Sequence, residues 1–234
     1  MAAFRWFVLL TLAYTVAQGS GQAEKDPHRP PCTSAECRKI RTFVKAHYCG
    51  ASPFANGPDD GCDTRVPKKI SSGVKVVADF ECRRDEVSGK ANCQQHGEPS
   101  AELRRLLLGE VRRLGLPHEV EGELHFMVWQ SSANTLAAAY YEHVSGDDLT
   151  LCQLIAVIDQ DGGVQILRKV RFQKTDADVP EVTRWAPIDI ADVDGDGRLE
   201  VILQGDDYEN HWYEVHGVRD GSFKMIFSGL GYYL

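Results

Sequence analysis

After Val120 the chain repeats short runs in which apolar and polar residues alternate, with turn residues between them. The runs are rich in β-branched and aromatic residues and have the lengths of strands. The sequences Asp161-Gly162-Gly163 and Asp220-Gly221 fall where hairpin turns are expected. This pattern predicts an antiparallel β-meander of about eight strands. The runs are residues 123–129, 135–144, 150–159, 164–172, 185–193, 199–204, 211–218 and 222–229.

Before Val120 the apolar positions follow helical spacing in two places. Thr33 and Glu36 form a capping box, with Thr33 as the N-cap, and predict a helix over residues 34–48. Ser100 caps a second predicted helix, which ends at Gly115.

Residues 74–82 are predicted to form a strand, and residues 50–62 contain prolines and glycines that exclude regular structure. That loop is either a connector closed by the cysteines at its ends or a presented binding surface, and we favour the connector.

Together these elements predict an α+β fold, in which an N-terminal disulfide-stapled helical region precedes the antiparallel β-meander. We expect a signal peptide at 1–23, a flexible lead-in at 24–31, a cysteine-rich helical and strand region at 32–117, and an acidic β region at 118–234.

The first residues have the features of a secretory signal peptide. Arg5 precedes the apolar run 7–17, and small residues follow up to a plausible cleavage site at Ala23. The apolar run is shorter than the ~20 residues that a membrane helix needs, so we expect no stable membrane span in the mature chain. The expected location is secreted or periplasmic.

Seven cysteines are present, six of them between Cys32 and Cys93, which in an exported chain indicates disulfides. Six cysteines allow 15 pairings, and we expect nearest neighbours to pair. A zinc site is not indicated, because no two cysteines have the CxxC spacing that is typical of one. The seventh, Cys152, lies in an apolar run and is expected to be a buried free thiol. The expected pairs are Cys32–Cys37, Cys49–Cys62 and Cys82–Cys93.

Charge is distributed unevenly along the chain. Residues 121–234 contain 8 basic and 20 acidic residues, a net charge of −12, whereas residues 24–120 carry a net charge of +3. The acidity of residues 121–234 does not favour nucleic-acid binding, because that binding requires clustered Lys and Arg. It suits cations or basic partners.

The stretch DVDGDGRLE, residues 192–200, crowds four carboxylates and two glycines into nine positions. Asp192, Asp194 and Asp196 occupy positions 1, 3 and 5 of a calcium loop, and Gly197 provides the sharp turn at position 6. Position 12, where a helix–loop–helix site has Glu, is Leu203, so Glu200 is the available closing ligand.

Strand-flanked DxDxDGxxE resembles the calcium hairpins of the FG-GAP and VCBS repeat families. The resemblance implies that calcium stiffens the hairpin and that Asp192, Asp194, Asp196, Glu200 and the Arg198 carbonyl are its ligands. Domains of these families often mediate adhesion or ligand binding, but a propeller needs many repeats and this chain has one clear copy. Residues 47–62 and 227–234 also resemble exported bacterial proteins to which no activity is attached.

No motif of hydrolytic chemistry accompanies the loop: HExxH, GxSxG and a glycine-rich phosphate loop do not occur. We therefore predict a non-catalytic, calcium-stabilised binding or interaction module with an unidentified protein or glycan partner. The alternatives are a secreted hydrolase, or a regulator of one, with an unrecognised site, and a purely structural envelope component.

Overall fold

Ten strands and two α-helices make up the described part of the chain, which comprises residues 32–49, 73–84, 91–145, 148–175, 182–207 and 210–233 of a computed structural model. These residues belong to one unit that spans residues 31–234. The helices are α1 (Ala35–Tyr48) and α2 (Ala101–Arg113), with a 3-10 helix, η1 (His118–Glu123). The strands are β1 (Lys75–Arg84), β2 (Ala91–Gly97), β3 (His125–Gln130), β4 (Asn134–Ser145), β5 (Asp148–Asp159), β6 (Val164–Thr175), β7 (Arg184–Ala191), β8 (Glu200–Asp206), β9 (Asn210–Arg219) and β10 (Ser222–Tyr233).

The strands form two antiparallel sheets. One has the order β2-β1-β3-β4-β5-β6 and the other the order β10-β9-β8-β7. The antiparallel β character and the eight strands expected after Val120 are confirmed as β3 to β10. They form two meanders in separate sheets, because the chain crosses from one sheet to the other between β6 and β7.

The predicted α+β fold is confirmed only in part, because the fold is mainly antiparallel β and the disulfide-bonded N-terminal region is not mainly helical. The N-terminal region contributes β1 and β2, and β1 pairs with β3 over residues 75–78. Strand β2 was not predicted, because its sequence ANCQQHG lacks the apolar alternation of a half-buried strand. It lies at the edge of its sheet, where polar residues are tolerated.

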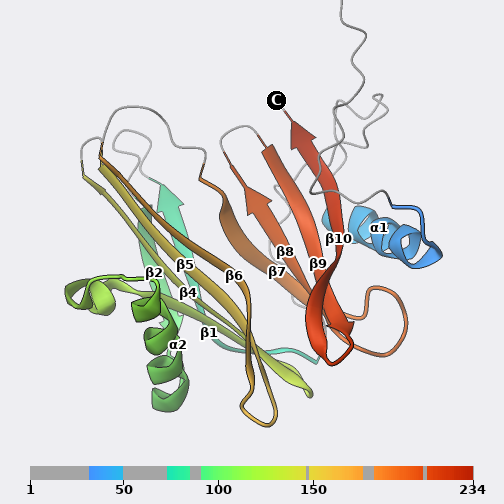
Figure 1. The fold of residues 1–234 in the computed structure, drawn as a ribbon, viewed down its shortest axis with the longest axis horizontal. Coiled ribbons are helices and arrows are strands. Elements are labelled where there is room, and N and C mark those ends of the chain that lie inside the picture. The colour runs from blue at the N-terminus through green and yellow to red at the C-terminus, as the bar shows by residue number, and fades with distance from the viewer. Residues whose placement is uncertain are drawn as a thin grey trace, which may run out of the picture. The chain divides into compact units, whose positions relative to one another are not determined.

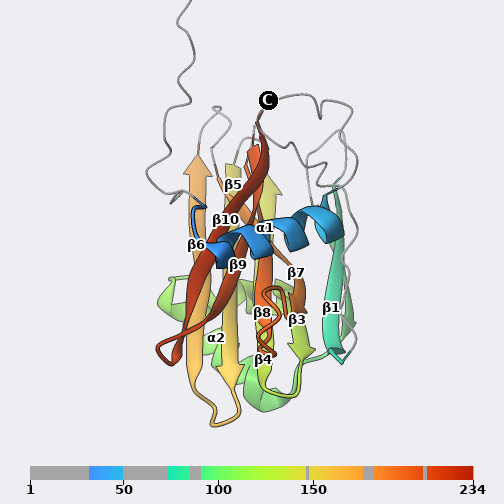
Figure 2. The same ribbon diagram turned by 90° about the vertical axis from the view of Figure 1, so that its right-hand side faces the viewer.

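Four layers follow one another across the unit: α2, the six-stranded sheet, the four-stranded sheet and α1 (Figure 1). Leu107 and Val111 of α2 pack on the outer face of the larger sheet. Ile40 and Val44 of α1 pack on the outer face of the smaller sheet, where α1 crosses β8, β9 and β10 (Figure 2). The core between the sheets includes the fully buried Trp129.

The helix ends follow from short-range hydrogen bonds. Ser34, not the predicted Thr33, is the N-cap of α1, and its hydroxyl accepts from the Cys37 N–H at 3.0 Å. Ser100 caps α2 as predicted, accepting from the Leu103 N–H at 3.2 Å. Gly115 follows α2 with φ +80°, a left-handed conformation in which glycine has no Cβ penalty.

Glutamine side chains hold the two sheets together at both edges of the smaller sheet. Gln153 of β5 donates to the Trp185 carbonyl of β7 at 2.8 Å and accepts from the Trp185 N–H at 2.9 Å. Gln165 of β6 makes the same pair of bonds with the backbone of Phe223 in β10. Because an amide carries both a donor and an acceptor, each side chain replaces one residue of a neighbouring strand.

A third glutamine repairs the six-stranded sheet where β1 diverges from β3. The regular pairing of these strands ends at Ala78 and Val128. Beyond it, Gln95 of β2 reaches both the N–H and the carbonyl of Phe126, each at 2.8 Å. The backbone of β3 is therefore satisfied while β1 and β3 separate.

The Gln153 bonds allow a direct test. Methionine at this position keeps the side-chain length but leaves the Trp185 N–H and carbonyl without their partner. We expect Gln153→Met to lower the free energy of unfolding by about 2 kcal/mol in urea denaturation. Gln173→Met, at an exposed position on β6, is the matched control. An unchanged denaturation midpoint in Gln153→Met would contradict this role.

Two of the expected disulfides are present, Cys32–Cys37 and Cys82–Cys93. Cys49 is also disulfide-bonded, and its expected partner Cys62 lies outside the described residues. These bonds indicate an oxidising environment. The signal peptide and the lead-in also lie outside the described residues. No helix of the described ranges has the length and hydropathy needed to cross a membrane.

Cys152 is a buried free thiol, as predicted. Burial raises its pKa to about 11, although Arg171 opposes the shift. A thiol with this pKa is almost entirely protonated at pH 8 and therefore a poor nucleophile. We expect no reaction with a thiol reagent in the native protein at pH 8 and one thiol per chain in guanidinium. Rapid native labelling, or several thiols after unfolding, would count against this arrangement.

Candidate functional site

The acidic loop connects β7 to β8 and is shaped by its own carboxylates. The Asp192 carboxylate accepts from the backbone N–H groups of Gly195, Asp196 and Gly197 at 2.8–3.1 Å. Gly195 and Gly197 adopt φ +77° and +84°, which other residues rarely tolerate. The sequence DGDG therefore folds into a tight bend whose backbone donors point inward.

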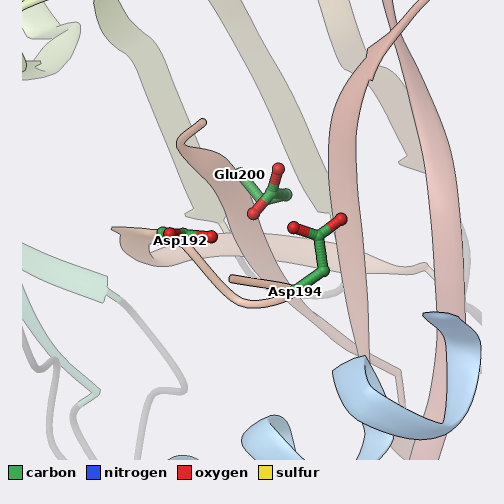
Figure 3. A group of neighbouring side chains, drawn as sticks. All are labelled: Asp192, Asp194 and Glu200. Carbon is green, nitrogen blue, oxygen red and sulfur yellow. The ribbon is translucent and has the colours of Figure 1, made fainter. Parts of the chain in front are cut away.

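Three carboxylates converge at this bend. Oxygens of Asp192, Asp194 and Glu200 lie within 4.8 Å of one another. Figure 3 shows Asp192 and Asp194 on the loop and Glu200 reaching towards them from the start of β8. Such a set of oxygens is the kind that binds hard divalent cations.

Glu200 is the deepest member of the group and is fully buried. One carboxylate oxygen accepts from the Val193 N–H at 2.9 Å. The other, Oε1, has no hydrogen-bond partner among the described residues. Burial raises the pKa of Glu200 to about 7; the Val193 bond opposes the shift, and the charges of Asp194, Asp196 and Asp192 add to it.

The neighbouring strand leaves room for this buried carboxylate. Glycine occupies position 217 of β9, and a Cβ there would lie 3.2 Å from Glu200 Cγ and 3.4 Å from its Oε1. A side chain at 217 would therefore crowd the carboxylate group.

Basic residues from elsewhere in the chain border the loop. Arg219 of β9 contacts Asp194 Oδ2 at 3.4 Å and also pairs with Glu36 of α1. Lys39 of α1 donates to the Asp194 carbonyl at 3.5 Å. The loop is thus connected to α1, which covers the same sheet.

The other two predicted ligands are Asp196 and the Arg198 carbonyl. The exposed Asp196 carboxylate accepts from the Arg198 N–H at 2.8 Å and lies 3.9 Å from the Arg198 guanidinium nitrogen Nε. Asp196 is not part of the converging group, and the role of the Arg198 carbonyl stays a prediction. Asp189, close in sequence, is buried and accepts a hydrogen bond from the Tyr48 hydroxyl at 2.7 Å. This bond holds α1 on the sheet.

The converging group could hold a divalent cation, because carboxylate oxygens are ligands of such ions. The unpartnered Glu200 oxygen is the position where a cation is most needed.

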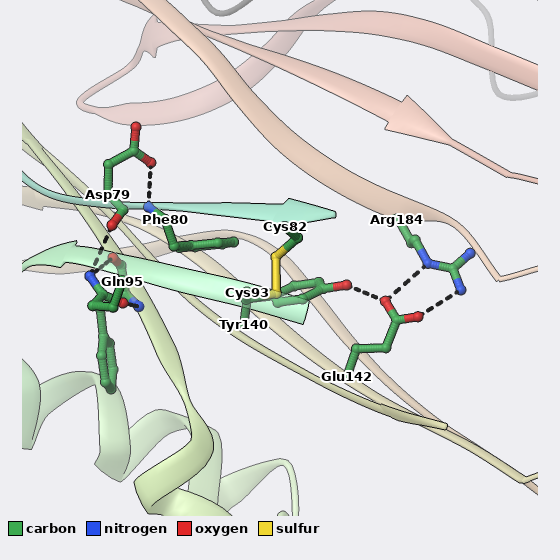
Figure 4. Close-up of a disulfide and its surroundings, with 9 residues drawn as sticks. Asp79, Phe80, Cys82, Cys93, Gln95, Tyr140, Glu142 and Arg184 are labelled. Atoms are coloured by element: carbon green, nitrogen blue, oxygen red, sulfur yellow. Dashed lines mark hydrogen bonds and ion pairs between the residues drawn. A yellow bond between two sulfur atoms is a disulfide. The ribbon is translucent and has the colours of Figure 1, made fainter. Parts of the chain in front are cut away.

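A second feature is a groove of about 760 Å³ that is lined by residues of both sheets, including Arg184, Trp185, Ala186 and Pro187 of the edge strand β7. Phe80 and Tyr140 stack in its lining, with ring centroids 5.5 Å apart, beside the Cys82–Cys93 disulfide (Figure 4). The sequence did not predict this groove, because its lining comes from six strands that belong to both sheets.

A buried polar group also lies between the sheets. His216 Nε2 is 3.0 Å from the Glu214 carboxylate, and Arg168 of β6 pairs with the same carboxylate. Both β9 residues are buried, so this group links β6 to β9. It is a structural ion pair within the sandwich.

Comparisons with protein-family models, with curated proteins and with solved structures found no match to this chain.

Because the pKa of Glu200 is raised, we expect the ion-free protein to become less stable as the pH rises. Its folded-state pKa of about 7 exceeds the ordinary value of 4.5, so its contribution to stability is complete below pH 4.5 and is lost as pH rises through 7. In chelator, we expect the free energy of unfolding of the unmodified protein to fall from pH 5 to pH 8, relative to Glu200→Gln, by on the order of 2 kcal/mol. Parallel pH profiles from calorimetry would contradict the burial of a charged Glu200.

Proposed function

We propose that this chain is an exported, non-catalytic binding module whose β-sandwich is stabilised by one calcium ion. One observation carries the proposal: the fully buried Glu200 has an unpartnered oxygen beside Asp192 and Asp194. A divalent cation would satisfy this oxygen and offset the repulsion between the three carboxylates. Asp196 and the Arg198 carbonyl, expected from the loop motif, complete the proposed ligand set.

The location of the loop supports a structural role for the ion. It joins β7 to β8 and contacts α1 through Arg219 and Lys39. An ion bound here would fix the hairpin and the side of the sheet that α1 covers. The disulfides agree with an oxidising compartment outside the cytoplasm, where calcium affinities of about 10⁻⁴–10⁻³ M are sufficient.

Thermal unfolding in calcium and in chelator tests the proposal. At a calcium concentration of about 100 Kd, binding should add about 2.7 kcal/mol. For a chain of this size that corresponds to a rise in Tm of roughly 5–10 °C. Magnesium at the same concentration should give a smaller rise.

Single substitutions test whether the calcium-dependent rise in Tm arises at the acidic loop. Asp194→Asn should abolish most of the calcium-dependent rise in Tm, because it removes one of the converging carboxylates. Asp220→Asn is the matched control, since Asp220 is an exposed turn residue whose carboxylate pairs with Lys224 and lies outside the acidic loop. Identical melting curves in calcium and in chelator would reject the proposal.

A further inference from the structure

We infer that Arg219 regulates the proposed cation site and couples it to helix α1, because its guanidinium contacts a carboxylate of each. The inference rests on the proposed function, since it concerns the same acidic loop. Calcium bound at the loop moves the guanidinium from Asp194 towards Glu36, and the attachment of α1 to the sheet becomes stronger. Binding of the ion and packing of the helix are therefore linked.

One nitrogen of Arg219 contacts both carboxylates. Its Nη2 lies 3.4 Å from Asp194 Oδ2 and donates a hydrogen bond to Glu36 Oε1. The other terminal nitrogen, Nη1, donates to the Val218 carbonyl at 2.8 Å, which holds the side chain at the end of β9. The two carboxylates thus share one positive charge, so a change of charge at Asp194 alters the contact with Glu36.

A cation at the loop competes with Arg219 for Asp194. The Asp194 side chain is 9% exposed, so solvent screens its contacts less than those of a surface carboxylate. Its Oδ1 accepts from the Asp196 N–H at 3.0 Å, and its Oδ2 contacts Arg219. Calcium on either oxygen places two positive charges beside the guanidinium. Arg219 therefore lowers the calcium affinity of the site.

Different contacts attach the two ends of α1. Glu36 lies in the first turn and pairs with Arg219. At the other end, the Tyr48 hydroxyl donates to Asp189 at 2.7 Å, and the Tyr48 carbonyl accepts from the Tyr213 hydroxyl at 2.9 Å. The bonds of Tyr48 do not involve the guanidinium, so the effect of calcium belongs to the first half of α1.

The coupling is reciprocal, as any linkage between two equilibria must be. If calcium strengthens the pair between Arg219 and Glu36, then Glu36 favours calcium binding, because it attracts the guanidinium away from Asp194. Loss of Arg219 and loss of Glu36 therefore change the calcium affinity in opposite directions. An arginine that only cross-links α1 to the loop would not give this pattern.

Calcium titrations of the full chain, followed by calorimetry, test this pattern. We expect Arg219→Gln to bind calcium about threefold more tightly than the unmodified chain, and Glu36→Gln about threefold more weakly. In the double variant the affinity should equal that of Arg219→Gln, because Glu36 then has no guanidinium to attract. Arg38→Gln is the matched control and should leave the affinity unchanged, since Arg38 is an exposed arginine of α1 that donates to the Thr33 carbonyl.

Hydrogen exchange of the α1 amides gives a second readout. In the unmodified chain, calcium should slow exchange in the first half of α1 more than in the second half. In Arg219→Gln this difference should disappear, because the ion no longer acts on Glu36. Cooperative melting of each variant in chelator shows that it is folded.

The outcomes separate this inference from the proposed function. An equal or weaker calcium affinity in Arg219→Gln would overturn the inference and leave the calcium site intact. An effect of Glu36→Gln that persists in the double variant would also overturn it, because Glu36 would then act directly on the ion. Absence of calcium binding by the unmodified chain would reject the proposed function, and this inference with it.

Discussion

The fold depends on how the edges of its smaller sheet are satisfied. A four-stranded sheet has two edge strands, and unpaired backbone groups at buried edges are costly. Here Gln153 and Gln165 extend from the larger sheet and bond both backbone groups of Trp185 and Phe223. The same bonds connect the two sheets and occupy the backbone of one residue on each edge strand.

Many of the strands and helices could be predicted from local sequence pattern, but their arrangement into two sheets could not. The strands after Val120 follow alternation within single segments, which is a local signal. Gln153 lies in the apolar run LCQLIAVI, and nothing nearby indicates that its amide replaces a strand. The one-residue error at the start of α1 has a local cause, since Thr33 and Ser34 are both good N-caps. The division into two sheets depends on contacts between distant strands.

The acidic loop shows the same division. The bend could be predicted, because the two glycines and Asp192 act within a few residues of one another. The resemblance to calcium hairpins implied five ligands, whereas the side chains that converge are Asp192, Asp194 and Glu200. The contacts of Arg219 and Lys39 come from β9 and α1 and have no sequence signal. The space beside Glu200 depends on a glycine in another strand.

These contacts explain how so many acids can be crowded in one loop. Backbone N–H groups satisfy Asp192, and Arg219 partly neutralises Asp194, so these two carboxylates are compensated within the chain. Glu200 is not, because it is buried and keeps one oxygen without a partner. Under the proposed function, most of the stabilisation by calcium would therefore arise at Glu200. Because this residue begins β8, the ion would act on the sheet itself.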